Sequence, residues 1–391
     1  MPFPPARCGQ YRDERQIMTV ATTETTSSPA RRNALLSLLG NDRDLYQRFC
    51  RIRDFSRKVR ASEYHITNAC NIRCKGCWFF VHEFDKKTRD LKDIATIRDF
   101  VRRQRDEGGI TAGILIGGEP AVVPERVSVF VEELDYVTIS TNGLKKLPVE
   151  GFERVSVLIS LFGGGRLDDE LRAIKPSGKR FSGLFDTALG HYRNDPRARF
   201  IYAITEDGIP YIEETVRRIR DNGNRTTFNF YSKYDTNHPL RQEHEKRLME
   251  EALRVRDKYP ETVLSTPFYI RAMITGKTKW GSFGYDVCPS LSTAHPQHAA
   301  RIANGNPVLP GFNVYAADYK TLNFCCTSGH CEDCRDSQAV MSWLLVNMSK
   351  FRGSREDMID WIELAESYWS QFIWSPVQRQ EPAPADIATA V

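Results

Sequence analysis

Three closely spaced cysteines have a pattern that could support metal chemistry. Cys70, Cys74 and Cys77 lie within eight residues, too close together to join distant segments as disulfides. Thiolates at this spacing can bind one metal centre together. A four-iron cubane takes one thiolate per iron, so three cysteines leave one iron open to a substrate or cofactor. The alternatives are a zinc site or three unrelated thiols, but zinc sites usually include a fourth Cys or His nearby, and none follows before His82.

The CxxxCxxC spacing resembles that of the radical S-adenosylmethionine (SAM) enzymes. In that superfamily the open iron of a 4Fe–4S cluster chelates the amino and carboxylate groups of SAM. An electron from the cluster then cleaves SAM to a 5′-deoxyadenosyl radical, which abstracts hydrogen from a substrate. The resemblance also implies a flavodoxin- or ferredoxin-type electron donor. The family often has an aromatic residue before the third cysteine, where this chain has Gly76, so we expect Trp78 to cover the cluster instead.

Two further motifs follow predicted strands. Gly117-Gly118-Glu119-Pro120 resembles the second-strand motif of the same superfamily. Its glycines allow the backbone to approach a ligand, and the segment can accept hydrogen bonds from the SAM ammonium, while Glu119 is expected to hold the turn. Ser140 and Asn142 match a family segment that contacts SAM or its ribose. Ordinary turns at the ends of strands are the alternative for both motifs.

A third strand end carries Ser160, with Arg172 later in the same segment. The two residues resemble the Ser-Leu-Asp-Gly…His-Asp-x-x-Arg pattern of the branch with extra clusters, although Phe162 replaces the Asp and Asp168 replaces the His. The resemblance implies that Ser160 and Arg172 bind the SAM carboxylate, a role that suits a forked guanidinium. A surface helix residue is the alternative for Arg172.

Five more cysteines occur where the alternation of strands and helices has ended. They can supply four metal ligands with one thiol to spare, and they are Cys288, Cys325, Cys326, Cys331 and Cys334. A predicted hairpin at 312–315 and 321–324 directly precedes Cys325. The arrangement resembles the SPASM and twitch extensions of radical SAM enzymes and implies one auxiliary 4Fe–4S cluster, with tetrahedral zinc as the alternative. The spare thiol, Cys325 or Cys326, is by elimination a candidate catalytic side chain.

Short apolar runs alternate with amphipathic segments through the middle of the chain. Strands are predicted at 63–67, 113–116, 136–140, 155–160, 199–205 and 226–231, and helices at 91–105, 125–134, 184–192, 211–220 and 243–256. This alternation implies a parallel sheet. Because the units are too few for an eight-fold barrel, we expect an α/β fold, a partial (β/α)6 barrel with a cysteine-rich auxiliary-cluster extension. The motifs then share the carboxyl edge of the sheet, where such folds bind ligands.

The predicted organisation begins with a disordered segment (1–30) and a helical extension (31–60). The extension has nine basic and three acidic residues, and we expect it to pack beside the core, with a docking surface for an acidic partner as the alternative. The partial barrel (61–258), the auxiliary-cluster region (259–345), a C-terminal helix (346–375) and a disordered tail (376–391) follow.

Composition excludes several classes of protein. Of 391 residues, 41% are hydrophobic and 27% are charged, as in an ordinary soluble protein. No apolar run approaches the roughly 20 residues of a membrane span, and the N-terminal residues lack the apolar core of a secretory signal. Clustered cysteines without such a signal favour the reducing cytoplasm. A net charge of +5 is too small to indicate a nucleic-acid partner.

These features together predict a radical SAM enzyme that abstracts hydrogen from a small metabolite, as in natural product biosynthesis. A peptide substrate is one alternative, but residues 31–60 are too short for the winged-helix leader-binding segment that a peptide maturase would carry. A non-catalytic metal-binding or electron-transfer protein is another, although such a protein would not need the motifs at the other strand ends.

Overall fold

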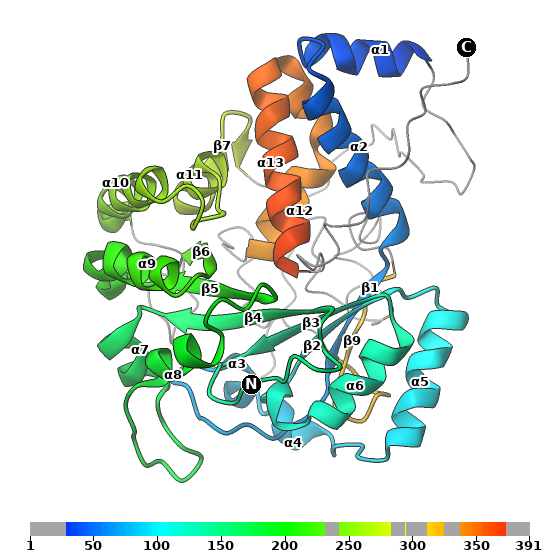
Figure 1. The fold of residues 1–391 in the computed structure, drawn as a ribbon, viewed down its shortest axis with the longest axis vertical. Helices are drawn as coiled ribbons and strands as arrows, with labels where there is room; N and C mark the ends of the chain where they lie inside the picture. Colours follow the sequence, from blue (N-terminus) through cyan, green and yellow to red (C-terminus); the bar gives the residue numbers. More distant parts are fainter. Residues whose placement is uncertain (1–28, 231–241, 283–293, 295–310, 324–336, 373–391) are drawn as a thin grey trace, which may run out of the picture.

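The structure of the chain is a computed structural model that describes residues 29–230, 242–282, 294, 311–323 and 337–372. Its centre is a sheet with the strand order β10-β9-β1-β2-β3-β4-β5-β6. Strands β1 to β6 pair in parallel in the order of the sequence. Strands β9 and β10 pair with each other in the antiparallel direction. The outermost strands, β10 and β6, do not pair with each other, so the sheet is open. This topology confirms the predicted α/β fold with a partial (β/α)6 barrel (Figure 1).

The six parallel strands occur where the apolar runs predicted them. The strands are β1 Ala61–His65, β2 Ala112–Ile116, β3 Tyr136–Thr141, β4 Val155–Phe162, β5 Ala198–Ile204, β6 Arg225–Phe230, β9 Val314–Tyr315 and β10 Leu322–Asn323, with a separate pair formed by β7 Lys277–Thr278 and β8 Gly281–Ser282. The predicted hairpin is confirmed as β9 and β10. In addition, β9 pairs in parallel with β1, which places the hairpin beside the strand that leads to the first cysteines.

Helices connect most of these strands. They are α1 Pro29–Leu38, α2 Arg43–Lys58, α3 Trp78–Val81, α4 Phe84–Lys87, α5 Ile94–Asp106, α6 Pro124–Glu133, α7 Gly165–Arg172, α8 Leu184–His191, α9 Ile212–Asp221, α10 Gln242–Lys258, α11 Pro267–Thr275, α12 Ser337–Val346 and α13 Arg355–Phe372. Local sequence sets several starts: the Asp93 carboxylate caps α5 by accepting from the Thr96 amide at 2.8 Å, and Pro124 begins α6. The connection between β3 and β4 contains no helix, so the alternation is interrupted once.

The two faces of the sheet differ in chemistry. Tyr64 of β1 packs against Phe100 of α5 and Phe130 of α6, with ring centroids 6.1 and 4.8 Å apart, so its face is covered by helices. Because side chains alternate along a strand, Glu63 and His65 point to the opposite face, which we call the inner face. In register with them, the inner face carries the buried polar side chains of Thr138, Ser156, Arg199 and Thr227.

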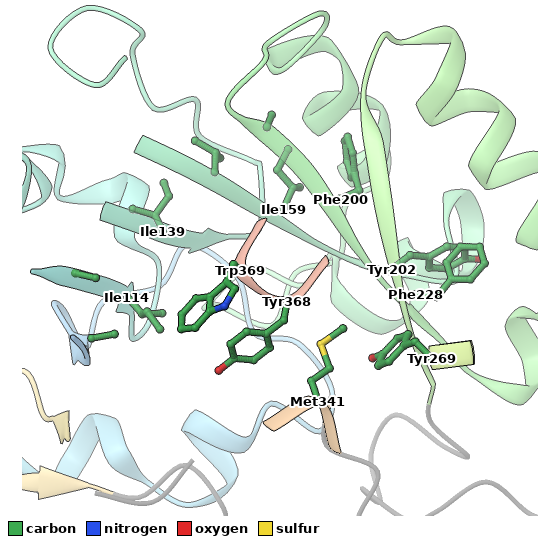
Figure 2. Packing of buried hydrophobic residues seen from close by; sticks show 14 of the residues in the cluster. Ile114, Ile139, Ile159, Phe200, Tyr202, Phe228, Tyr269, Met341, Tyr368 and Trp369 are labelled. Carbon is green, nitrogen blue, oxygen red and sulfur yellow. The ribbon is translucent and has the colours of Figure 1, made fainter. Parts of the chain in front are cut away.

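The C-terminal helices pack against the sheet from the side of the inner face. Arg199 of β5 donates to the Ser370 hydroxyl of α13 at 3.0 Å. Figure 2 shows Met341 of α12 together with Tyr368 and Trp369 of α13 beside the strands, as part of the main hydrophobic core. The helices α12 and α13 therefore pack against this face of the sheet through apolar side chains and this one hydrogen bond.

The basic N-terminal extension packs beside the core, as predicted. Arg48 of α2 forms a two-point ion pair with Glu366 of α13, at 3.1 and 2.8 Å. Phe49 and Phe55 of the same helix contact the rings of Trp361 and Trp369, with centroids 5.8 and 5.4 Å apart. Within the part of the chain that the structure describes, no helix is both long and apolar enough to cross a membrane.

Candidate active site at the carboxyl edge of the sheet

The first cysteine cluster follows β1 on a loop, with Cys77 at the N-cap of α3. Burial raises the pKa of the Cys70 thiol to about 12, and the nearby charges of Glu119, Cys74 and Cys77 act in the same direction. Burial also raises the pKa of Cys77, again with a contribution from Cys74. The thiols therefore lie close enough to affect one another. As placed they are not preassembled, because no group of three His, Cys, Asp or Glu residues in the described ranges is arranged as metal ligands.

The segment that leads from β1 to the cysteine loop is anchored by one carboxylate. Asp90 accepts from the Thr67 hydroxyl and from the Asn68 amide, both at 2.7 Å. Arg126 of α6 pairs with Asp90 at 3.0 Å and donates to the Ile66 carbonyl at 2.6 Å. The buried Arg126 thus offsets the charge of Asp90 and ties the loop to the helix layer.

The cysteine loop is also bound to the segment that follows β4. The amides of Arg73 and Lys75 donate to the carbonyls of Ile174 and Leu171, at 2.7 and 2.8 Å. Gly76 has a φ of +63°, a left-handed conformation that an aromatic side chain rarely adopts. The backbone of this loop therefore explains why glycine stands where the related family often has an aromatic residue.

The two glycines after β2 approach the cysteine loop rather than open space. The Gly118 amide donates to the Thr67 carbonyl at 2.8 Å, and the Glu119 amide donates to the Ala69 carbonyl at 2.9 Å. A Cβ on Gly117 would lie 2.5 Å from the Thr67 oxygen, and one on Gly118 would lie 2.1 Å from the Ala69 oxygen. The sequence suggested that these glycines admit a ligand; in the structure they admit the backbone just before Cys70.

Glu119 holds the turn, as expected from the sequence. It is buried and accepts from the Ala121 amide at 2.9 Å, the Thr141 hydroxyl at 2.7 Å and the Asn142 amide at 2.8 Å. The Asn142 side chain in turn donates to Asn71 in the cysteine loop at 2.7 Å. Burial raises the pKa of Glu119, and these three hydrogen bonds oppose that rise. The ends of β2 and β3 and the cysteine loop are thus joined by one buried network.

Arg172 is a buried residue of α7 and not a surface residue. Its guanidinium pairs with the buried Asp168 at 3.2 Å and donates to the Ser160 carbonyl at the end of β4. Asp168 also accepts from the Phe162 amide at 2.7 Å. The positive charge of Arg172 lowers the pKa of both Cys77 and Glu119, although burial dominates in each case. Ser160 and Arg172 are therefore brought together near the cysteine loop, while Ser140 lies half-buried on the inner face of β3.

Sequence reasoning missed an aromatic and histidine cluster next to the site. The ring of Trp78 lies 5.6 Å from that of His65 and 5.5 Å from that of Phe84. His65 is 1% exposed, and burial lowers its pKa to about 3, so the imidazole is neutral. Its Nδ1 lies 3.4 Å from the side-chain amide nitrogen (Nδ2) of Asn323 on β10. The sequence did not reveal this cluster, because the neighbours of His65 come from α3, α4 and the distant strand β10.

The donor set at this edge fits an iron–sulfur cluster. Three thiols stand on one partly buried loop, and the buried Arg172 guanidinium lies close enough to favour the thiolate of Cys77. Because burial raises the pKa of Cys70 and of Cys77, a bound cationic centre would release the protons of these two thiols. The second predicted cluster, comprising Cys288, Cys325, Cys326, Cys331 and Cys334, lies outside the described residues.

No protein-family model and no curated protein matches the chain. Among solved structures, a hexahistidine-tagged anSMEcpe with bound AdoMet has a TM-score of 0.46 and 12% identity, over 69% of this chain and 72% of that chain. The FeFe-hydrogenase maturase HydG from Carboxydothermus hydrogenoformans has a TM-score of 0.36 and 13% identity, over 82% and 80%. Methylornithine synthase (PylB) also has a TM-score of 0.36 and 13% identity, over 85% and 96%. With every TM-score below 0.5, these similarities do not assign the chain to a family.

Proposed function

We propose that this chain is a radical SAM enzyme that acts on a small metabolite. The observation that carries the proposal is the junction at the carboxyl edge of the sheet. There the CxxxCxxC loop is hydrogen-bonded to the ends of β2 and β3 and to the segment after β4. A structural zinc loop would not require a buried arginine–aspartate pair and a network of strand ends around it.

In this proposal Cys70, Cys74 and Cys77 hold a 4Fe–4S cluster with one open iron. When bound, the cluster supplies the electron that cleaves SAM, and the resulting radical takes hydrogen from the substrate. Glu119 keeps the Gly-Gly-Glu-Pro turn in shape, and Asn142 fixes the loop through Asn71. The reducing electron would come from a flavodoxin- or ferredoxin-type donor.

Arg172 would provide positive charge for the SAM carboxylate, together with Ser160. Its ion pair with Asp168 fixes the guanidinium at the end of β4, so Asp168 is a positioning residue. Trp78 would shield the site from water, since it lies against His65 and Phe84 beside the third cysteine. Water exclusion matters because a radical is quenched by competing reactions in an open site.

The packing of the N-terminal extension supports a small metabolite over a peptide. Within residues 31–60, α2 is engaged with α13 through the Arg48–Glu366 pair and two aromatic contacts, and it forms no winged helix.

The proposal includes one auxiliary 4Fe–4S cluster held by the C-terminal cysteines. Asn323, the last residue of the hairpin, is two residues before Cys325 and contacts His65 at the end of β1. This contact brings the chain next to the active-site edge just before the predicted ligands, which supports a second cluster near the first.

Anaerobic reconstitution with iron and sulfide, followed by addition of SAM and dithionite, tests the proposal. We expect 5′-deoxyadenosine by mass spectrometry and a change in the cluster's EPR signal when SAM is added. Cys74→Ser should abolish both, whereas Cys50→Ser provides a matched control, because Cys50 is a free thiol on α2, away from the site. If the original chain forms no 5′-deoxyadenosine, or if the two variants form equal amounts of it, the proposed radical SAM activity is wrong.

The auxiliary cluster has a separate test. A Cys70/Cys74/Cys77→Ala triple variant should retain about four iron atoms per chain, the content of one cubane. Zinc in place of iron, or iron near zero, would contradict the second cluster and leave the first proposal intact.

A further inference from the structure

A pocket of about 340 Å³ opens at the amino ends of β4, β5 and β6. This is the edge of the sheet opposite the cysteine loop, because parallel strands place all their carboxyl ends at one edge. The polar side chains that matter most in its lining are Ser156, Asp195, Arg197, Arg199, Arg225 and Ser370. The pocket therefore lies apart from the site described above, and its chemistry is dominated by arginine.

One of the three arginines is fully used by the fold. Arg197 forms a bidentate pair with Asp195, at 3.0 and 2.7 Å, and donates to the carbonyls of Leu147, Pro148 and Phe152. The charges of Arg197 and Asp195 neutralise each other, and the hydrogen bonds of Arg197 hold the loop before β4. Both carboxylate oxygens of Asp195 are therefore engaged by Arg197.

The other two arginines are neighbours across the sheet. Arg199 of β5 and Arg225 of β6 are register partners, and like charges at paired positions repel each other. Arg199 is 5% exposed and donates to the neutral Ser370 hydroxyl at 3.0 Å, which sets the position of its guanidinium. Arg225 is exposed and forms no ion pair with any residue that the structure describes. Both arginines line the pocket, so an anion bound there would be attracted by two positive charges.

A hydroxyl group in the same lining has no partner. Ser156 is 2% exposed, and its Oγ makes no hydrogen bond in the structure. A buried hydroxyl is normally hydrogen-bonded, and leaving it unpaired costs free energy. Because Ser156 lines the pocket, a ligand with acceptor oxygens would satisfy it.

We propose that this pocket binds the phosphate group of a small phosphomonoester. Two guanidinium groups and a hydroxyl donor match the charge and the acceptor oxygens of a phosphate. The pocket volume is at the lower end of the roughly 300–1,000 Å³ typical of ligand sites, so it fits a small carbon skeleton with its phosphate. Since Arg199 also holds α13 through Ser370, the ligand would strengthen the docking of α13 on the sheet. The proposal does not depend on the radical SAM function.

Isothermal titration of the full-length chain with glycerol 3-phosphate and with inorganic phosphate, at constant ionic strength, tests the proposal. We expect Arg225→Gln and Ser156→Ala each to weaken binding at least roughly tenfold, as expected for the loss of a charge-assisted contact or of a donor to a dianion. Ser156→Ala should fold normally, because its hydroxyl has no partner to lose. If glycerol 3-phosphate binds more tightly than inorganic phosphate, the ligand is a phosphomonoester. Equal affinities would mean that the pocket recognises free phosphate and not the ester.

Two variants serve as matched controls. Thr138→Val removes another buried hydroxyl without a partner, at the position in register with Ser156 but outside the pocket lining. Arg103→Gln removes an exposed charge on α5. Both should bind like the original chain. No binding of either ligand, or binding that Arg225→Gln and Ser156→Ala leave unchanged, would overturn the proposal. Production of 5′-deoxyadenosine by Arg225→Gln should stay unaltered, so failure here is distinct from failure of the radical chemistry.

Discussion

Gly118→Ala is the sharpest test of how the cysteine loop is held. Gly118 follows β2, and a Cβ at this position would lie 2.1 Å from the Ala69 carbonyl oxygen. The obstacle is backbone and not a flexible side chain, so the two segments would have to separate by about an ångström. The segment that moves is the one that leads directly into Cys70.

The expected cost follows from the contacts that such a separation breaks. The Gly118–Thr67 hydrogen bond at 2.8 Å and the Glu119–Ala69 hydrogen bond at 2.9 Å join the segments. Each contributes about 0.5–1.5 kcal/mol, so their loss accounts for about 2 kcal/mol. Residual overpacking adds about 1 kcal/mol or more. We therefore expect Gly118→Ala to lower the free energy of unfolding by about 3 kcal/mol.

Urea unfolding of the iron-free chain, followed by far-UV circular dichroism, measures this change. Gly190→Ala is a matched control, because Gly190 lies in α8 with no atom within 4 Å of the added Cβ. That replacement should stabilise the chain by up to about 1 kcal/mol through helix propensity. Iron loading on reconstitution should fall in Gly118→Ala only. If the two variants have free energies of unfolding within about 1 kcal/mol of each other, the close approach is not what holds the loop.

Three further predictions concern charged and titratable groups. Arg172→Gln leaves Asp168 buried without its partner and should cost about 3–5 kcal/mol in the same unfolding assay, and additive costs in an Arg172→Gln, Asp168→Asn double variant would contradict the pairing. The Nε2 atom of His65 lies 3.9 Å from Glu63, and burial lowers the pKa of His65 to about 3. Below about pH 6.5 the unfolded chain therefore binds a proton at His65 that the folded chain does not bind. Stability should thus fall as the pH drops from about 6.5 toward 3, and the difference in stability between pH 7 and pH 5 should shrink in His65→Asn; an unchanged difference would assign it to other groups. Glu366→Ala should cost no more than about 1 kcal/mol, since its pair with Arg48 is partly exposed, and a larger loss would mean that the pair organises α2 and α13.

Local patterns predicted the parallel strands and the motifs at their ends. Period-two apolar runs and glycine turns depend on neighbouring residues, so the positions of β1 to β6 and of Gly117 to Pro120 followed from the sequence. The shared edge of the sheet followed from topology alone, because parallel strands end on the same side. The hairpin at β9 and β10 was also visible from its sequence.

Contacts between distant segments could not be predicted in the same way. That β9 pairs with β1, or that Gly118 contacts Ala69, depends on packing between segments far apart in the chain. Arg172 was ambiguous because its helix has only eight residues, five of them charged, and its pairing with Asp168 accounts for its burial. His65 was hidden for a similar reason, since its ring is enclosed by residues from α3 and α4.

The buried pair also explains how this chain can depart from the pattern it resembles. The pattern places a carboxylate at the position of Phe162 and a histidine at the position of Asp168. A guanidinium as buried as that of Arg172 needs a negative partner, and Phe162 cannot provide one. Asp168 provides it from one turn earlier in α7, and it also accepts from the Phe162 amide at 2.7 Å. The centre of the Phe162 ring lies 5.3 Å from the guanidinium, so it contributes a cation–π contact to the same group. Asp168 thus supplies the negative charge that Phe162 cannot, and Arg172 lies beside Ser160.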